Sequence, residues 1–237
     1  MPAFRIHPAT ADRFGDVATI LNPSGNDRAC WCLAYRAKPA DYSRLRGDER
    51  AEHVRALCAA DPAPGVLAYD GAVPVGWCGV GPRAHLHRMT RSRTMPPIDD
   101  VPAWTVVCFV VRAGHRRKGV AHALLAGAVS YARSHGAPVI EGYPVDPGEG
   151  RINSSAAHVG TIGLFAAAGF ELVAETQARS DRKPRWLMRL DLRDSSGGAR
   201  PALPREVAKA TFATLNVAKA AFATRSTRPN RTSIATD

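Results

Sequence analysis

No stretch of the sequence comes close to the roughly 20 consecutive apolar residues that a helix needs to cross a bilayer. Residues 1–13 also lack the continuous apolar segment of a secretion signal. These two absences predict a protein with no membrane partner and a cytoplasmic location.

Cysteine is scarce and odd in number, with five residues in 237. A chain of this length does not need disulfide staples, so we expect free thiols in a reducing compartment. Cys30 and Cys32 flank Trp31, and neither a Cys-x-x-Cys nor a His-x-x-x-His pair follows them. His85 and His87 have no carboxylate or cysteine close by in the sequence. We therefore expect no metal site.

Acidic residues are also few, 21 against 32 Lys and Arg, and the formal net charge is +11. Such an excess suits nucleic acid, an acidic surface or a phosphorylated ligand. Much of it lies in two clusters, at residues 83–93 and 112–118. A polyphosphate ligand would account for the second cluster, so a nucleic-acid partner is not favoured.

Apolar residues make up 45% of the chain, which suffices for one packed domain over residues 1–193. Alternating and helical spacings of these residues predict the elements of that domain. We expect strands at 4–6, 66–69, 73–80, 103–111, 139–143, 170–175 and 186–192, and helices at 10–21, 48–58, 118–135 and 159–168. The dipeptide Asp70-Gly71 is expected to form the turn of a hairpin between the second and third strands.

One segment carries a chemical signal. The uninterrupted apolar run 103–111 is typical of a central strand buried on both faces. Arg116, Arg117 and Lys118 follow it and precede a helix with one apolar face. Free amides and the positive end of the dipole attract anions to such a helix start, and the small residues Gly119 and Ala121 let a pyrophosphate come close.

Other phosphate motifs do not fit this loop. It contains neither the Gly-x-Gly-x-x-Gly fingerprint of dinucleotide-binding folds nor the Gly-x-x-x-x-Gly-Lys-Ser/Thr of a P-loop. The remaining alternative is a basic, solvated helix start on an ordinary α/β protein.

Two motifs resemble those of a known family. Arg116-x-x-Gly119-x-Ala121, set between a buried strand and an amphipathic helix, resembles the acetyl-coenzyme A signature of the GNAT acetyltransferase superfamily, here of an actinobacterial type. Phe165-Ala-Ala-Ala-Gly169-Phe170 resembles the family's later aromatic-x-x-x-Gly-Phe motif. The resemblance covers about residues 4–192. It implies an α/β (α+β) fold, with a mixed, mostly antiparallel twisted sheet of six to seven strands and about four flanking helices.

The resemblance also implies an N-acetyltransferase activity, with acetyl-CoA as the acyl donor. Phe109 to Val111 would offer backbone hydrogen bonds to the pantetheine arm, and residues 116–121 would hold the pyrophosphate. The implied cofactor-binding residues are Phe109, Val110, Val111, Arg116, Arg117, Lys118, Gly119, Val120, Ala121 and Phe165.

The acid and base common in that family have no counterpart here. The position of the usual Tyr acid is Phe165, and residues 104–111 contain no carboxylate where many relatives place a Glu. Glu141 and Asp100 are the expected catalytic residues instead; Asp99, Asp146 and His158 are further candidates. A buried Glu141 needs a partner, so it either pairs with an Arg or serves as a base with a raised pKa.

The acceptor would bind between the connection after the first helix and the basic insert at residues 81–102. Trp31, Tyr35 and Arg83 are the expected substrate-binding residues, suited to an aromatic or anionic acceptor. Packing and solvation of surface loops explain these side chains equally well.

Three functions remain open: acyl transfer to the amine of a small molecule, non-catalytic acyl-CoA binding or regulation, and acetylation of nucleic acid or protein aided by a basic tail. That tail, residues 194–237, holds two copies of an approximate repeat, at 207–214 and 217–224. We expect it to be disordered or marginally helical. A homodimer is also considered.

Overall fold

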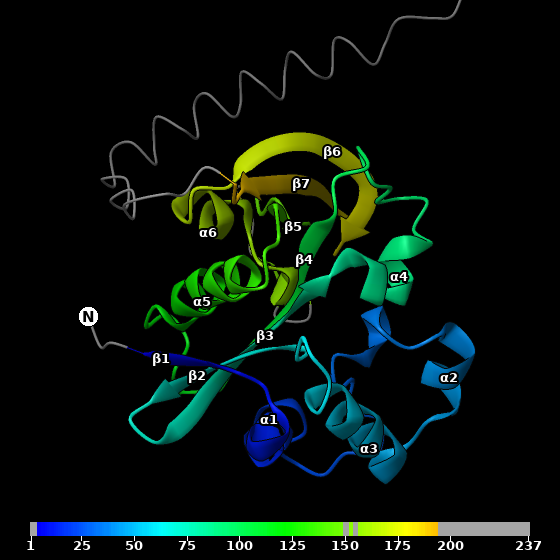
Figure 1. The fold of residues 1–237 in the computed structure, drawn as a ribbon, viewed down its shortest axis with the longest axis vertical. Helices are drawn as coiled ribbons and strands as arrows, with labels where there is room; N and C mark the ends of the chain where they lie inside the picture. Colours follow the sequence, from blue (N-terminus) through cyan, green and yellow to red (C-terminus); the bar gives the residue numbers. More distant parts are fainter. Residues whose placement is uncertain (1–3, 149–151, 154–155, 194–237) are drawn as a thin grey trace, which may run out of the picture. The chain divides into compact units, whose positions relative to one another are not determined.

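The computed structural model describes residues 4–148, 152–153 and 156–193. The expected tail at 194–237 lies outside them, as do both repeats. Seven strands form a single sheet in the order β1-β2-β3-β4-β5-β7-β6 (Figure 1). Their bounds are β1 Arg5–Pro8, β2 Gly65–Asp70, β3 Val73–Pro82, β4 Ala103–Val111, β5 Val139–Gly142, β6 Glu171–Ser180 and β7 Lys183–Asp191.

The sheet is mixed but mostly antiparallel, as the family resemblance implied. Strands β4 and β5 are the one parallel pair among its neighbours, and α5, which connects them, is long enough for the crossover that such a pair requires. The described residues include no helix long and apolar enough to cross a membrane.

The described residues form six α-helices rather than about four. Their bounds are α1 Phe14–Leu21, α2 Pro39–Arg44, α3 Gly47–Cys58, α4 His87–Thr90, α5 Val120–Ser134 and α6 Ile162–Ala167. The two unexpected helices, α2 and α4, span six and four residues. Segments this short cannot show a helical repeat of apolar residues, so their sequences gave no periodic signal.

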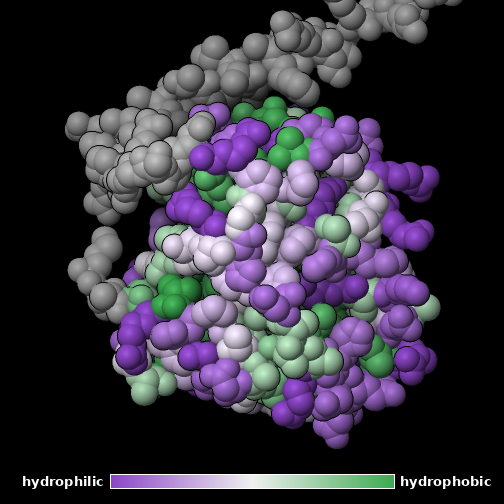
Figure 2. Space-filling view, viewed as in Figure 1, coloured by the Kyte–Doolittle hydropathy of each residue, from purple (hydrophilic) through white to green (hydrophobic). Residues whose placement is uncertain are grey.

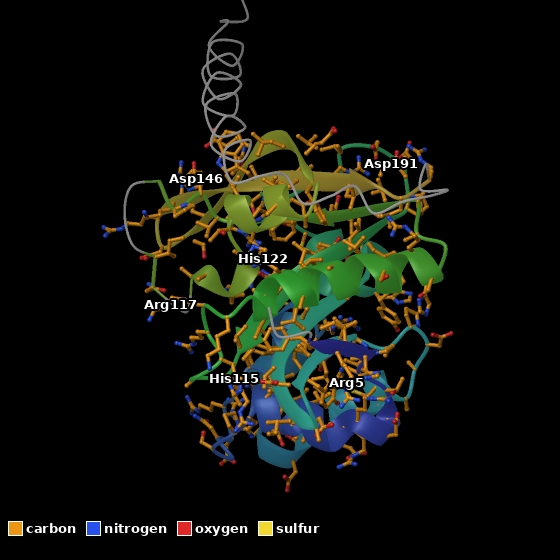
Figure 3. All side chains as sticks on the ribbon, turned by 90° about the vertical axis from the view of Figure 1, so that its left-hand side faces the viewer. Arg5, His115, Arg117, His122, Asp146 and Asp191 are labelled. Atoms are coloured by element: carbon orange, nitrogen blue, oxygen red, sulfur yellow. The ribbon has the colours of Figure 1, made fainter. Side chains whose placement is uncertain are left out.

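Helices cover both faces of the sheet. A Cβ on Gly76 of β3 would touch Val120 and Leu124 of α5, whereas one on Gly79 would touch Cys32. Residues three apart on a strand point to opposite faces, so α5 and the segment around Cys32 lie on different sides. Figures 1 and 3 show α5 packed along its own face of the strands.

The hairpin between β2 and β3 corrects one expectation. Asp70 pairs with Val73, so the two-residue turn is Gly71-Ala72 and not Asp70-Gly71. A register irregularity between Ala68 and Tyr69 shifts the pairing by one residue. Gly71 supplies the left-handed backbone that the turn needs, with φ at 59°.

Strands β6 and β7 are longer at their shared turn than expected. They join through Asp181 and Arg182, whose φ angles are 52° and 62°. A tight hairpin with two left-handed residues usually uses Asn or Gly there, so this Asp-Arg turn was not recognised.

Hydrophobic side chains do not form one continuous area on the face in Figure 2, where they appear in separate groups among hydrophilic residues. Val73, Ile98 and Val173 are the large exposed hydrophobic residues of the described chain. They come from β3, from the insert before β4 and from β6.

The pairing of β4 creates an opening in the sheet. Residues Ala103 to Val106 pair with β5, but β5 ends at Gly142, and from Cys108 onwards β4 pairs with β3 alone. Val107 is itself an extra residue, because Val80 pairs with Val106 and Gly79 with Cys108. We call the region beside residues 107–111 the strand opening.

Candidate functional site

The loop from β4 to α5, residues 112–119, has an unusual backbone. Gly114, Arg117 and Gly119 all lie in the left-handed region, with φ at 81°, 61° and 89°. A backbone that changes hand in this way collects its N–H groups on a concave side, where an anion can accept from them. Arg117 adopts this conformation without being glycine, which costs conformational energy and is common at ligand sites.

Helix α5 continues the same site. Gly119 is its N-cap residue and has no side chain to cap the free amides of the first turn. No acidic residue lies in that turn, so no carboxylate of the helix itself offsets the positive end of its dipole. An anionic ligand is the natural partner for this helix start.

Basic side chains surround the loop. Arg116, Arg117 and Lys118 are exposed, and Arg116 donates to the carbonyl of Val111 at 3.3 Å. Figure 3 shows His115 and Arg117 at the end of α5 that also carries His122. The structure therefore brings residues 116–121 together at one helix end, beside the last residues of β4.

Phe165 of α6 closes one side of the strand opening. Its ring packs against Phe109 of β4 with centroids 6.2 Å apart, and it is completely buried. The ring occupies space left by Gly142 and Gly160, where added Cβ atoms would come within 2.2 and 2.8 Å of it. Phe165 thus shapes the end of β5 but has no proton to donate.

Glu141 lies opposite Thr105 in the parallel pair and is 3% exposed. Its Oε1 accepts hydrogen bonds from Arg83 at 2.6 Å and Thr105 at 3.1 Å, and Arg189 Nε lies 3.8 Å from Oε2. Of the two alternatives for this carboxylate, the structure shows the ion pair with an arginine.

Tyr143 completes this network. Its hydroxyl donates to Glu141 at 3.1 Å and accepts from Arg83 at 2.7 Å. Burial, and then the charge of Glu141, raise the pKa of Tyr143 well above its usual range, so the phenol keeps its proton. Tyr143 directly follows β5, at the strand opening. Tyr143 was not among the expected catalytic residues, although its position two residues after Glu141 puts both on one face of the strand.

The other carboxylate candidates lie elsewhere. Asp99 binds Arg189 through two hydrogen bonds of 2.5 and 3.2 Å, which lower its pKa. Asp100 is exposed just before β4, whereas the basic loop follows the other end of that strand, about 26 Å away at roughly 3.3 Å per residue. Asp146 accepts from the amide of Gly148 at 3.0 Å in the loop after β5. The structure thus places Glu141, but not Asp100, beside the strand opening.

The expected acceptor residues fall into different surroundings. Trp31 is buried and stacks on Phe14, with ring centroids 6.1 Å apart. Tyr35 ends the short 3-10 helix η2, Leu33–Tyr35, and its hydroxyl lies 3.4 Å from Nε2 of His158. Arg88 of α4 lies over the Tyr35 ring, 5.4 Å from its centroid. Tyr35, on the connection between α1 and α2, therefore contacts both the insert before β4, through Arg88, and the segment before α6, through His158.

Arg83 is fully engaged by the protein. Besides Glu141 and Tyr143, it donates to the carbonyls of Met89 at 3.1 Å and Met95 at 2.5 Å. It ties the insert to β5. In the described part of the chain, no three His, Cys, Asp or Glu side chains come together as a metal site would require.

Arg50 of α3 is a buried cation that was not among the expected site residues. Its guanidinium donates to the carbonyls of four residues at 2.7 to 2.9 Å, namely Arg28, Ala29, Tyr42 and Leu45. It thereby holds the connection that carries Trp31 and Tyr35. A helical Arg among polar neighbours resembles a solvated residue in sequence, so no local pattern could identify this role.

Comparisons with known proteins agree with these features. The chain matches the Acetyltransferase (GNAT) family over residues 30–148, half of its length. No curated protein matches it. Among solved structures it is similar to yncA, a putative acetyltransferase from Salmonella typhimurium with its cofactor acetyl-CoA, at 17% identity and a TM-score of 0.48, over 83% of this chain and 98% of that one.

Two further solved structures are similar over most of their length. An N-acetyltransferase from Staphylococcus aureus Mu50 shows 16% identity and a TM-score of 0.48, over 81% of this chain and 99% of that one. A GNAT acetyltransferase from Streptococcus pneumoniae shows 14% identity and a TM-score of 0.47, over 80% and 99%.

The family match includes the connection with Tyr35, strands β2 to β5, the basic loop and α5. These are the elements that form the strand opening and the anion site. The chain belongs to the acetyltransferase (GNAT) family.

Proposed function

We propose that this protein is an acetyl-CoA-dependent N-acyltransferase that moves an acetyl group directly to the primary amine of a small molecule. One observation carries the proposal: the left-handed basic loop leads from the strand opening of β4 straight into the uncapped start of α5. A ligand that combines a pyrophosphate with an extended arm fits this arrangement, because the pyrophosphate can bind at the helix start while the arm lies along the strand opening.

Acetyl-CoA is such a ligand, and it supplies an acetyl group activated as a thioester. The amides and side chains of residues 116–121 would hold its pyrophosphate. Backbone groups of Phe109, Val110 and Val111 would bind the pantetheine arm, because β4 has no β5 partner there. Phe165 would support this arm from the side through Phe109.

Residues at the end of β5, where its pairing with β4 stops, would carry out the proton transfers of the reaction. Transfer needs a neutral amine and a donor that protonates the leaving sulfur. Tyr143 keeps its proton and stands at the end of β5, so we assign it as the proton donor. Glu141 is the candidate carboxylate, held in place by Arg83: it would take up the proton that the attacking amine loses, by way of the Tyr143 hydroxyl, and return it to that hydroxyl once Tyr143 has given its own proton to the sulfur. Asp100 is the second candidate and could act only through solvent, since it is exposed before β4.

The acceptor would approach from the side of Tyr35. Arg88 and His158 adjoin this phenol. Arg83 would shape the site by fixing the insert, and Trp31 by packing beneath the connection. The cytoplasmic location, the homodimer and the actinobacterial type stay predictions.

A second function keeps specific support. Phe165 cannot donate a proton, and Glu141 is tied to Arg83, so the fold could bind an acyl-CoA without turnover. Such a protein would regulate or buffer acyl-CoA and would need the same basic loop.

An assay of thiol release over a panel of primary amines distinguishes the two functions. The transferase predicts turnover with at least one amine and its loss in Gly119→Glu, which adds bulk and negative charge at the anion site. Gly136→Glu is the matched control, because Gly136 also has a positive φ, 68°, but at the other end of α5. Turnover that survives Gly119→Glu would overturn the assignment, and cofactor binding without turnover on any amine would support the second function.

A further inference from the structure

Two buried cysteines meet on the face of the sheet opposite α5. Gly79 and Cys108 are direct cross-strand partners in β3 and β4, and such partners have Cβ positions about 4.5–5.5 Å apart. The sulfur of Cys32 lies 2.7 Å from the place where a Cβ on Gly79 would be. The missing side chain of Gly79 therefore makes room for the Cys32 sulfur beside Cys108.

The surroundings of Cys32 favour an anion. The indole N–H of Trp77 is buried without a hydrogen-bond partner among the described residues, and it lies 3.3 Å from the same Cβ position on Gly79. The guanidinium of Arg36, on the same connection as Cys32, donates to two backbone carbonyls, of Pro64 and Val80. The neighbouring Cys108 thiol, followed by Arg36 and Trp77, lowers the pKa of the Cys32 thiol to about 7 against the effect of burial.

The other cysteines differ from Cys32. Burial raises the pKa of Cys58 to about 11 and that of Cys78 well above its usual range, so both stay protonated. Cys30 is exposed. Cys32 thus combines anionic character with a neighbouring thiol in a way that the others do not.

The backbone at Cys32 is also exceptional. Trp31 and Cys32 are consecutive non-glycine residues in the left-handed region, with φ at 51° and 57°. Each costs conformational energy, at a point where the Cys32 sulfur lies against Gly79 of β3. Cys108 follows the extra residue Val107, where the strand opening begins.

We propose that Cys32 and Cys108 form a redox pair that closes to a disulfide under a small peroxide, joining the connection around η2 to β4 at the strand opening. This modification site is independent of the proposed acyl transfer, since it needs neither cofactor nor acceptor.

The chemistry balances with hydrogen peroxide as the oxidant. The Cys32 thiolate attacks one peroxide oxygen, the O–O bond breaks, and the released hydroxide takes up a proton to leave as water. The Cys108 thiol then attacks the sulfenic sulfur of Cys32. An S–S bond forms, the S–O bond breaks, and a second water leaves with the thiol proton. Two electrons pass from the two sulfurs to the peroxide.

The test is disulfide mapping on the full chain. The reduced protein is treated with a few equivalents of hydrogen peroxide, its remaining thiols are alkylated, and it is digested without reductant for mass spectrometry. The expected product is one Cys32–Cys108 cross-linked peptide, two hydrogens lighter than the reduced pair and restored by dithiothreitol. Cys30, Cys58 and Cys78 should be recovered as alkylated peptides.

Variants and competing products make the outcome decisive. Cys108→Ser should abolish the cross-link and leave Cys32 as a sulfenic acid that dimedone traps, while Cys58→Ser, a buried control, should leave the cross-link unchanged. The wild-type map does not depend on how any variant folds. A Cys30–Cys32 disulfide, a disulfide between chains through Cys30, or full recovery of free Cys32 and Cys108 would each overturn the proposal.

Discussion

The carboxylate of Glu141 accepts a hydrogen bond from Arg83 at 2.6 Å, although 58 positions separate the two residues. Both side chains are nearly inaccessible to solvent, at 3% and 11% exposure. This ion pair couples the insert before β4 to the end of β5, which sets the geometry of the strand opening.

Removing one partner of this ion pair should destabilise the protein. Glu141→Gln leaves Arg83 buried without its carboxylate, and breaking a buried pair in this way costs about 3–5 kcal/mol of unfolding free energy. Urea unfolding measures the loss. Glu52→Gln is the control, because its pair with Arg55 is mostly exposed and should matter little. Similar midpoints for the two variants would mean that Glu141 is solvated in solution.

Arg50 should be essential to the connection that carries Tyr35. Arg50→Met removes the donors of four carbonyls that lie around a buried side chain, with an expected loss of about 3 kcal/mol in unfolding free energy. Arg44→Met, at an exposed arginine of α2, should change stability by much less. A wild-type urea midpoint for Arg50→Met, with a lowered midpoint only for Arg44→Met, would show that Arg50 does not hold the connection in place.

Introducing a tyrosine at position 165 should not raise the activity. The Cζ atom of Phe165 lies 2.5 Å from where a Cβ on Gly142 would be, so a hydroxyl added there runs against the end of β5. Phe165→Tyr should lower unfolding free energy by about 1–3 kcal/mol and leave kcat no higher. Tyr143→Phe, in contrast, should lower kcat by roughly 100-fold or more while KM changes little. A higher kcat in Phe165→Tyr would contradict the assignment of Tyr143 and would indicate a proton donor on α6.

The thiolate character of Cys32 predicts a pH dependence. Its pKa falls from 9.0 to about 7 in the folded protein, with Cys108, Arg36 and Trp77 around it. A depressed pKa stabilises the fold at high pH, and this contribution fades as pH falls from about 9 through about 7. The stability of wild type relative to Cys32→Ser should therefore grow from pH 6.5 to 9. Urea unfolding of both proteins at several pH values measures this difference. A difference in unfolding free energy that stays constant across the range would show that Cys32 remains a neutral thiol.

Local patterns in the sequence predicted the basic loop, the succession of strands along the chain and the helix that follows β4. Each of these depends on neighbours within one element, such as the apolar run of residues 103–111 and the spacing along α5. The Asp70-Gly71 turn was misplaced because a bulge two residues earlier changed the register, and bulges depend on the partner strand.

The site residues that the sequence did not reveal are joined across long separations. Tyr143 matters because Arg83 and Glu141 reach it, Arg50 because four carbonyls converge on it, and Cys32 because Gly79 leaves space for its sulfur. Tertiary packing creates these environments, and apart from the two-residue spacing of Glu141 and Tyr143 the composition and periodicity of the sequence do not indicate them.

The most direct test of the account is calorimetric titration of the full chain with coenzyme A. The basic loop and the start of α5 predict binding that weakens with salt, falls at least about 100-fold in Gly119→Glu and persists in Gly136→Glu. Equal affinity of wild type and Gly119→Glu, or no binding by the wild-type protein, would contradict the assignment of residues 112–121 as the cofactor site.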